Sequence, residues 1–404
     1  MRVLDETWQV VSLPIFALVA MLDQRLSEKS HWALSSVSGF GTNPEPAASA
    51  LRLTHHSIQH ESPRATFGRS LTLMITPPSQ RIGIVTSNAE KLADYFPTTA
   101  EPHFVPTEPP FTPDDQLLVD ELRRRGHQVS AVVWGAETSR LTDRFDRLIV
   151  RSPWDYMDSD EQRQGFLHWL EQLAATGLVV ENEVAVMLWL MDKRYLLDFA
   201  AVGVPIVPTQ LIPVGESFDL ETFVEQHVAA VIKPAVSAAG AGLEFLPDRQ
   251  AAREFQPEFA ARCQRGAQLV QPFLPEIQTN GEWSLVYFGG EYSHGIHKLP
   301  ASGQIMVHAE RGGSLRFADP PAVLRELGDR TAAAIPRAFA HRGGRSCRMP
   351  LYLRIDVIET ATGGLLSECE GVEPELFFRA RSGSAARFAK LIENGASYTS
   401  CGRN

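Results

Sequence analysis

The sequence predicts a mixed α/β (α+β) protein in which a small N-terminal parallel α/β domain precedes two α+β subdomains. Strand-like and helix-like segments alternate between residues 81 and 182, which favours a parallel sheet. From Glu183 onward, a helix pair leads into mostly antiparallel patterns. The chain has 404 residues, 44% apolar and 21% charged, a globular composition with room for two or three domains.

The first 80 residues are predicted to be a poorly ordered extension. Residues 30–80 are rich in Ser, Pro, Thr, His and Gly and lack sustained periodicity. The longest apolar run, Val10 to Leu22, has 13 residues, fewer than the roughly 20 needed to cross a bilayer. It also lacks the basic start and the cleavage site of a signal peptide.

The N-terminal domain is predicted to span residues 81–182. Its expected elements are a strand at 81–86, a helix at 113–126, strands at 129–134 and 147–151, an amphipathic helix at 160–176 and a strand opening at Val179.

The two subdomains are predicted at 183–271 and 272–396, with a tail at 397–404. Asp192 is expected to cap a helix over 193–202 that stops at Gly203. Further elements are strands at 231–234 and 268–274, a hairpin at 283–298, a helix at 320–340, a hairpin at 351–371 and a helix at 384–394.

Charge and cysteine content narrow the classes of partner. The formal net charge is −10 and the pI is about 5.7, so no basic excess is available for a nucleic-acid backbone. Four cysteines show no C-x-x-C spacing, which fits neither a zinc cluster nor a disulfide scaffold. We therefore expect a cytoplasmic protein with neither nucleic acid nor membrane as a partner.

The last hairpin carries candidate metal ligands. A three-residue loop at 361–363, with its last glycine in the left-handed conformation, would place Asp356 opposite Glu368 and Arg354 opposite Glu370. Opposed β-carbons lie about 4.5 to 5.5 Å apart, so two carboxylates can share a magnesium ion. Taken alone, the hairpin favours a solvated strand face with an incidental Arg–carboxylate pair.

Two lysines are candidate phosphate ligands. Lys233 ends a β-run and precedes a loop of small residues, whose backbone N–H groups can surround phosphate oxygens. This loop lacks the spacing of a Walker loop and the third glycine of a dinucleotide fingerprint. Lys193, in the first turn of its predicted helix, opposes the helix dipole unless an anion lies nearby. A phosphate or Asp192 would resolve that conflict, and the loop by itself also fits a plain mobile connection.

A proline-containing connector, Gln271 to Glu276, follows the small-residue loop. Its prolines make it stiff and extended, with few internal hydrogen bonds. Free backbone groups there could read an adenine edge while Glu276 holds ribose hydroxyls. A simple interdomain linker is the alternative.

In this order the pieces resemble the ATP-grasp family. The resemblance covers roughly residues 81–394 and rests on these strings: Asp-Lys193, Val-Ile-Lys233-Pro, Glu282-Trp-Ser, Lys298, Arg354-x-Asp356 and Glu368-x-Glu370. The strings Val-Arg-Ser-Pro-Trp-Asp-Tyr156 and Gly-Glu-Trp-Ser-Leu285 resemble the cycloserine-forming cyclo-ligase branch and its glutathione-synthetase-like relatives.

The resemblance implies an ATP-grasp fold whose two subdomains sandwich ATP with one or two Mg²⁺ ions, for which Mn²⁺ can substitute. The implied ATP-binding residues are Lys193, Lys233, Ser237, Gly240, Gly242, Gln271, Phe273, Leu274, Glu276 and Glu282. Asp356, Glu368 and Glu370 would hold the metal, while Lys298 and Arg354 would act catalytically by neutralising the transferring phosphoryl group. Many family members have Asn where Glu370 stands, so Glu373 competes for the third metal position.

Substrate contacts are less sharply indicated. Arg151 and Asp155 end a strand, where open α/β sheets place ligand contacts, and Arg311 can grip a carboxylate bidentately. For these three a surface or fold-supporting role stays open, and Glu373 joins them as a substrate candidate. His294 and His297 are expected to be packed histidines rather than catalytic bases.

The implied activity is an ADP-forming ligase acting on a small, amino-acid-like carboxylate. ATP would convert the carboxylate to an acyl phosphate, and a nitrogen would attack it to form an amide-type C–N bond. With an O-ureido-serine-like substrate, the attack would be an intramolecular cyclisation, and the loop after Lys233 would act as a lid. The alternatives are an intermolecular ligase of glutathione-synthetase type and a non-catalytic ATP-binding module. The oligomeric state is open, a homodimer being one option.

Overall fold

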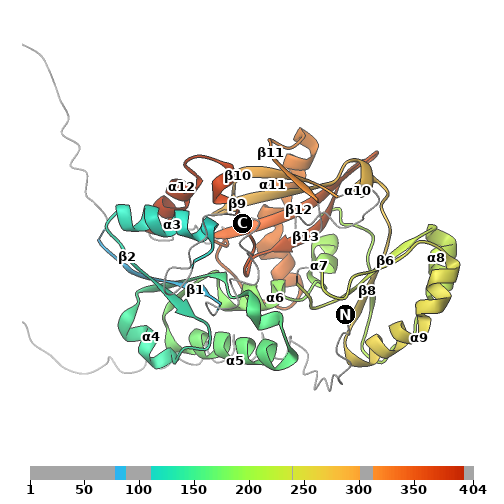
Figure 1. The fold of residues 1–404 in the computed structure, drawn as a ribbon, viewed down its shortest axis with the longest axis horizontal. Coiled ribbons are helices and arrows are strands. Elements are labelled where there is room, and N and C mark those ends of the chain that lie inside the picture. Colours follow the sequence, from blue (N-terminus) through green and yellow to red (C-terminus); the bar gives the residue numbers. More distant parts are fainter. Residues whose placement is uncertain (1–77, 88–110, 239, 301–312, 395–404) are drawn as a thin grey trace, which may run out of the picture.

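The structure is a computed structural model that describes residues 78–87, 111–238, 240–300 and 313–394 (Figure 1). The predicted extension, up to residue 77, and the predicted tail lie outside the described residues. The same holds for the substrate candidate Arg311.

The N-terminal domain is a four-stranded parallel sheet with strand order β2-β1-β3-β4, as the alternating pattern predicts. Its elements are β1 (Arg81–Thr86), α3 (Pro113–Arg124), β2 (Gln128–Val133), α4 (Thr138–Arg144), β3 (Arg147–Ser152), the 3₁₀ helix η1 (Trp154–Met157), α5 (Asp160–Thr176) and β4 (Val179–Glu181). All six residues of β3 are buried, and its middle is the apolar run Leu148 to Val150, as in a central parallel strand. Ser159 caps α5 through its side chain.

Two short helices, α6 (Val184–Leu190) and α7 (Tyr195–Ala201), connect this sheet to the rest of the chain. The helix predicted from residue 193 begins instead at Tyr195, so Lys193 precedes it in a turn. The Asp192 carboxylate accepts hydrogen bonds from the Arg194 backbone, at 3.0 Å, and from its guanidinium. Gly203 ends the helix at φ 89°, as predicted.

A second, four-stranded antiparallel sheet has the order β5-β8-β6-β7 and forms the lobe seen with α8 and α9 in Figure 1. Its elements are β5 (Gln210–Ile212), α8 (Leu220–His227), β6 (Ala230–Pro234), β7 (Glu244–Leu246), α9 (Arg249–Arg265) and β8 (Gln268–Pro272).

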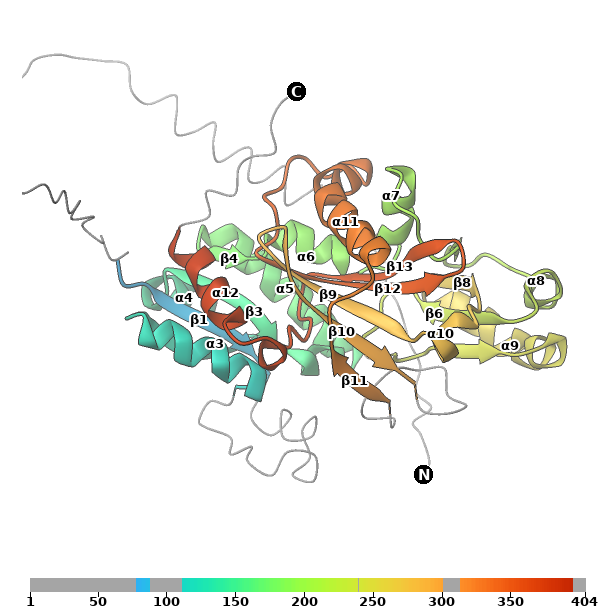
Figure 2. The same ribbon diagram turned by 90° about the horizontal axis from the view of Figure 1, so that it is seen from above.

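The third sheet has five strands in the order β11-β10-β9-β12-β13. Helix α11 lies over one face of it beside α7 (Figure 2). The elements are α10 (Glu276–Thr279), β9 (Glu282–Phe288), β10 (Glu291–Leu299), β11 (Ser314–Phe317), α11 (Ala322–His341), β12 (Tyr352–Thr360), β13 (Gly363–Glu370), the 3₁₀ helix η3 (Phe378–Ala380) and α12 (Ser384–Glu393).

Burial separates the lobe from the rest. One core cluster joins α5, α6 and α7 to the five-stranded sheet and α11, and a second joins α3 and β1 to β9 and α12. The lobe has a core of its own, from Ile212 to Val270. The N-terminal sheet and the five-stranded sheet therefore form one packed unit, while most of the lobe packs separately and Leu269 of β8 joins it to the first cluster. Among the described residues, no helix is both long and apolar enough to cross a membrane.

Candidate active site

The hairpin β12–β13 places its charged residues as predicted, but by a different route. Asp356 pairs with Glu368 and Arg354 with Glu370. Thr360 pairs with Gly363, so the loop has two residues rather than three, and the ladder shifts by one residue between Asp356 and Val357. This β-bulge restores the register that a three-residue loop would have given.

Three carboxylates converge at this end of the sheet. Asp356, Glu368 and Glu370 each offer one oxygen, and these oxygens lie within 4.8 Å of one another. Glu373 does not belong to that group. Three oxygen donors so close together fit a hard cation such as Mg²⁺, which takes oxygen ligands at about 2.0 to 2.1 Å.

Arg354 holds the cluster together. Its guanidinium donates to Asp356 Oδ1 and Oδ2, at 3.0 Å and 2.9 Å, and also to Glu370. Ser284 on the neighbouring strand β9 donates its hydroxyl to Asp356 Oδ1 at 2.5 Å. The Asp356 side chain is almost fully buried, and these contacts fix its orientation.

Three lysines from three different elements face the same carboxylates. Lys193 Nζ lies 3.5 Å, and Lys233 Nζ 3.9 Å, from Glu368 Oε1. Lys298 Nζ lies 3.6 Å from Glu282 Oε1 and 4.0 Å from Asp356 Oδ2. The predicted phosphate ligands and catalytic cations are thus gathered around the predicted metal ligands.

Burial and neighbouring charges shift the pKa values of these groups in different directions. Burial disfavours an ionised Asp356, but Arg354 and Lys298 outweigh it and lower its pKa to about 2. Burial raises the pKa of Glu370 to about 8, although Arg354 opposes that shift. Burial and the Asp356 charge raise the pKa of Glu282 to about 7, and burial lowers the pKa of Lys233. Without a cation the site holds more carboxyl groups than it can keep ionised, so its donor set fits a divalent ion.

The small-residue loop after Lys233 closes against Lys193. The Lys193 amide donates to Ala235 O at 2.7 Å, and its Nζ donates to the Ser237 carbonyl. Gly240 and Gly242 adopt φ values of 70° and 72°. A β-carbon at Gly242 would lie 2.8 Å from Pro234 Cγ, so this position requires glycine both for its conformation and for space.

The predicted adenine connector is partly bonded within the protein. The Gln271 side chain is buried and donates to Thr209 Oγ1 at 2.7 Å, while the Phe273 amide donates to Ala229 O at 3.0 Å. Leu274 O accepts a hydrogen bond from Ile277 at the start of α10, so the connector ends in a helical turn rather than continuing extended. Glu276 begins α10 and is half-buried.

The two substrate candidates in the N-terminal domain, Arg151 and Asp155, are buried and make contacts within the protein. Arg151 is 2% exposed and donates to Asp115 Oδ1 at 3.0 Å and to Pro374 O at 2.9 Å. Asp155 is buried and accepts a hydrogen bond from Trp134 Nε1 at 2.6 Å. Both therefore lie inside the protein in fold-supporting contacts, the alternative left open by the sequence.

Glu373 follows β13 and faces the N-terminal domain. Its Oε1 accepts a hydrogen bond from Tyr156 Oη at 2.7 Å, whereas its buried Oε2 has no hydrogen-bond partner within the described part of the chain. Burial raises the pKa of Glu373, and its charge interacts with Lys193 and Arg354. The Glu373 carboxylate thus contacts Tyr156 on one side and interacts with the charges of Lys193 and Arg354 on the other.

Several supporting residues escaped the sequence interpretation. They carry hydroxyl groups that donate or accept hydrogen bonds at the site and its strands: Tyr156, Tyr195, Thr209, Ser284 and Ser367. Tyr156 and Ser284 lie within the family-like strings, but those strings gave them no role in the site. Ser367, the extra residue of the bulge, donates to Asp356 O, and Tyr195 Oη accepts from the Cys369 amide at 2.9 Å. The predicted histidines are structural: His294 is buried and its ring bonds to Leu376 O, while His297 stacks on Trp283.

Solved structures share this fold. The crystal structure of D-cycloserine synthetase DcsG superposes with a TM-score of 0.61 at 24% identity, covering 78% of this chain and 99% of that one. A RimK-domain ATP-grasp protein from Sphaerobacter thermophilus has a TM-score of 0.50 at 16% identity, covering 78% of this chain and 98% of that one. The fold is therefore the ATP-grasp fold.

Sequence relatives agree with the fold. Residues 95–182 match the family model of the D-cycloserine synthetase DcsG N-terminal domain. The cycloserine biosynthesis protein DcsG of Streptomyces lavendulae is 29% identical over 262 residues, which is 62% of this chain and 83% of that protein. A glutathione synthetase of Synechocystis is 29% identical over 148 residues, covering 36% of this chain and 44% of that enzyme. By fold and sequence similarity, the chain is related to ATP-grasp ligases, enzymes that join carbon to nitrogen with ATP.

Proposed function

We propose that the chain activates the carboxylate of a small, amino-acid-like substrate as an acyl phosphate and that a nitrogen of the same molecule closes a ring on it. One observation carries the proposal: Lys193, Lys233, Lys298 and Arg354 surround the convergent carboxylates at the end of β12 and β13. Similarity over 262 residues to the cycloserine biosynthesis protein DcsG, and the match of residues 95–182 to the DcsG N-terminal domain model, support the cyclising form.

The chemistry requires activation because an ionised carboxylate resists attack by an amine. In the first step a carboxylate oxygen bonds to the γ-phosphorus of ATP, and the bond from that phosphorus to ADP breaks. In the second step nitrogen attacks the acyl carbon and inorganic phosphate leaves. With an O-ureido-serine-like substrate, ring closure and the hydrolysis of the carbamoyl group by one water release carbon dioxide and ammonia.

The cations have separate tasks in this scheme. Lys193 and Lys233, which face Glu368 from the loop side, would bind phosphate oxygens. Lys298 and Arg354 would neutralise the phosphoryl group as it transfers, the usual contribution of positioned cations to phosphoryl transfer. Asp356, Glu368 and Glu370 would hold magnesium, and the bound ion would supply positive charge that offsets the charge of the phosphates.

The loop between Lys233 and Gly242 would exclude water from the acyl phosphate. It belongs to the lobe that has its own core, and its Ser237 carbonyl accepts a hydrogen bond from Lys193 Nζ. A phosphate on Lys193 would compete with that carbonyl, which would couple nucleotide binding to loop position.

Glu373 is the residue we assign to the substrate's amino group. Its Oε2 is buried and unpartnered in the described residues, and Tyr156 fixes Oε1. An ammonium group would supply the missing partner for this carboxylate. Glu373→Gln should therefore raise KM for the amino acid substrate at least tenfold while leaving KM for ATP within twofold. Equal changes in both constants would contradict this assignment.

ADP release tests the function directly. The protein, ATP and Mg²⁺ are incubated with single candidate acids, and ADP is measured together with the mass of the product. We expect one acid alone to stimulate ADP formation and to yield a cyclic product, with Asp356→Asn as the inactive control. If ATP binds and no acid stimulates ADP formation, the chain is a non-catalytic ATP-binding module.

The intermolecular ligase is the second candidate, and the similarity to glutathione synthetase favours it. A requirement for a second amine, with both substrates joined in the product, would establish this alternative in place of cyclisation.

A further inference from the structure

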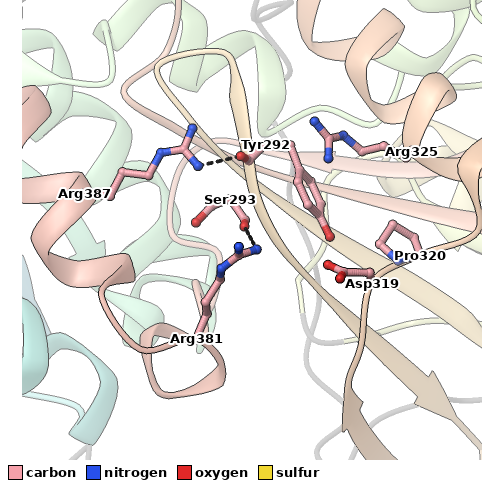
Figure 3. Close-up of a pocket in the computed structure, with 7 residues that line it drawn as sticks. All are labelled: Tyr292, Ser293, Asp319, Pro320, Arg325, Arg381 and Arg387. Atoms are coloured by element: carbon pink, nitrogen blue, oxygen red, sulfur yellow. Dashed lines mark hydrogen bonds between the residues drawn. The ribbon is translucent and has the colours of Figure 1, made fainter.

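A cavity of about 410 Å³ lies at the opposite end of strand β10 from Lys298. Tyr292, which lines it, is six positions before Lys298, a separation of about 20 Å at roughly 3.3 Å per residue. Its lining comes from β10, from the segment before α11, from α11 and from the segment around α12: Tyr292, Ser293, Asp319, Pro320, Arg325, Arg381 and Arg387 (Figure 3). The volume is within the range of small-molecule sites, about 300 to 1,000 Å³.

A β-bulge positions the arginines on one wall. The pairing of β10 with β9 shifts between Tyr292 and His294, so Ser293 is the extra residue. Arg387 donates to Tyr292 O and Arg381 to Ser293 O, each at 2.7 Å. Since a guanidinium has five N–H donors, each arginine is oriented by the bulge and keeps donors for a ligand.

The other wall carries both an acidic residue, Asp319, and Arg325 of α11. Figure 3 shows Asp319 and Pro320 across the Tyr292 ring from Arg381 and Arg387. Tyr292 is 9% exposed, and its hydroxyl interacts with the Asp319 carboxylate. Burial and the Asp319 charge raise the pKa of Tyr292 to about 12, so the phenol keeps its proton.

Charge pairing distinguishes the lining residues. Arg325 is paired with Asp329 at 2.9 Å and lies over the Tyr292 ring, and Arg387 is paired with Glu291 at 2.9 Å. Arg381 and Asp319 form no ion pair within the described ranges of the chain. Both side chains are exposed, so a solvated charge of each sign, without an ion-pair partner in those ranges, borders the cavity on opposite sides of Tyr292.

We propose that this cavity binds a small zwitterion of the amino-acid class, with its carboxylate on Arg381 and its ammonium on Asp319. A simple anion would gain the arginine contacts but would meet the Asp319 carboxylate. A zwitterion satisfies both charges, and Tyr292 adds a protonated hydroxyl between them. The site is separate from the proposed catalytic cluster and does not depend on the reaction that occurs there.

Binding of L-serine and glycine to the full-length protein tests the proposal. Isothermal titration is carried out at constant ionic strength, with acetate and methylammonium as single-charge probes. We expect saturable binding of both amino acids. Arg381→Gln and Asp319→Asn should each weaken it at least tenfold, and acetate and methylammonium should bind at least tenfold more weakly than glycine.

Two controls separate this cavity from the catalytic site. Arg330→Gln removes an exposed arginine of α11 that does not line the cavity and should leave binding unchanged. Glu373→Gln perturbs the proposed substrate site and should also leave this binding unchanged. Asp319 is exposed, so Asp319→Asn remains informative if Arg381→Gln does not fold. The proposal is overturned if wild type shows no saturable binding, if acetate binds as well as glycine, or if Asp319→Asn binds like wild type.

Discussion

The affinity for magnesium should depend steeply on pH because Glu370 must lose a proton to become a ligand. Its pKa is raised to about 8, chiefly by burial. A carboxyl group with that pKa is roughly 9% ionised at pH 7 and roughly 1% at pH 6. Metal binding requires the ionised ligand. The apparent dissociation constant should therefore rise about tenfold from pH 7 to pH 6, or about 1.4 kcal/mol.

The raised pKa of Glu370 also makes the stability of the metal-free protein depend on pH. Between the usual pKa of 4.5 and about 8, native Glu370 holds a proton that the unfolded chain has lost. The metal-free protein should therefore lose stability as pH rises through that window. Magnesium reverses the loss because it stabilises the ionised carboxylate, so the rise in melting temperature on adding Mg²⁺ should be larger at pH 8 than at pH 6.

Calorimetry measures both consequences. Magnesium is titrated into the protein at pH 6, 7 and 8 in two buffers of different ionisation enthalpy, which reports the protons released. Glu370→Gln is the matched variant: it should bind magnesium more weakly at pH 8 and lose most of the pH dependence. An affinity for wild type that stays constant between pH 6 and pH 7.5, without proton release, would refute this reasoning.

Three further predictions concern single positions. Asp356→Asn should lower magnesium-dependent ADP formation at least a hundredfold while circular dichroism stays unchanged; normal turnover would remove Asp356 from the metal site. Gly242→Ala should cost about 1–2 kcal/mol in urea unfolding, because φ is 72° and the new β-carbon meets Pro234; no cost would show that the loop adapts. Val228 is 80% exposed at φ 70°, so Val228→Gly should stabilise the fold by about 1 kcal/mol, and a lower urea midpoint would contradict the inferred strain.

The sequence was most informative where periodicity and turn residues agree. Strand β1 and helix α5 have the predicted bounds, because a short β-rich run and an amphipathic run with Ser159 as its cap leave few alternatives. The elements of the lobe were harder to predict from the sequence. Strands β5 and β7 have three residues each, too few to show a period of two, and α9 contains Pro257.

The catalytic hairpin shows the limit of local reasoning. Two routes give the same pairing of Asp356 with Glu368: a three-residue loop, or a two-residue loop with a bulge at Ser367. Turn chemistry alone does not separate them, because Gly363 suits both. The difference matters for function, since the bulge places the Ser367 hydroxyl 3.0 Å from Glu282 Oε2, on the carboxylate that faces Lys298.

Residues at and after the end of β3 position the Glu373 segment without being substrate contacts themselves. Arg151 donates to Pro374 O, Trp154 Nε1 donates to Glu373 O at 3.1 Å, and Tyr156 holds the Glu373 carboxylate. These contacts attach the segment after β13 to the end of β3. Two core clusters also join the parallel sheet to the five-stranded sheet, so the N-terminal domain fixes where Glu373 lies, while most of the lobe that carries Lys233 packs in its own core. Substrate selection and phosphate closure would thus depend on different parts of the molecule, and mutations in the two parts should separate KM for the amino acid from KM for ATP.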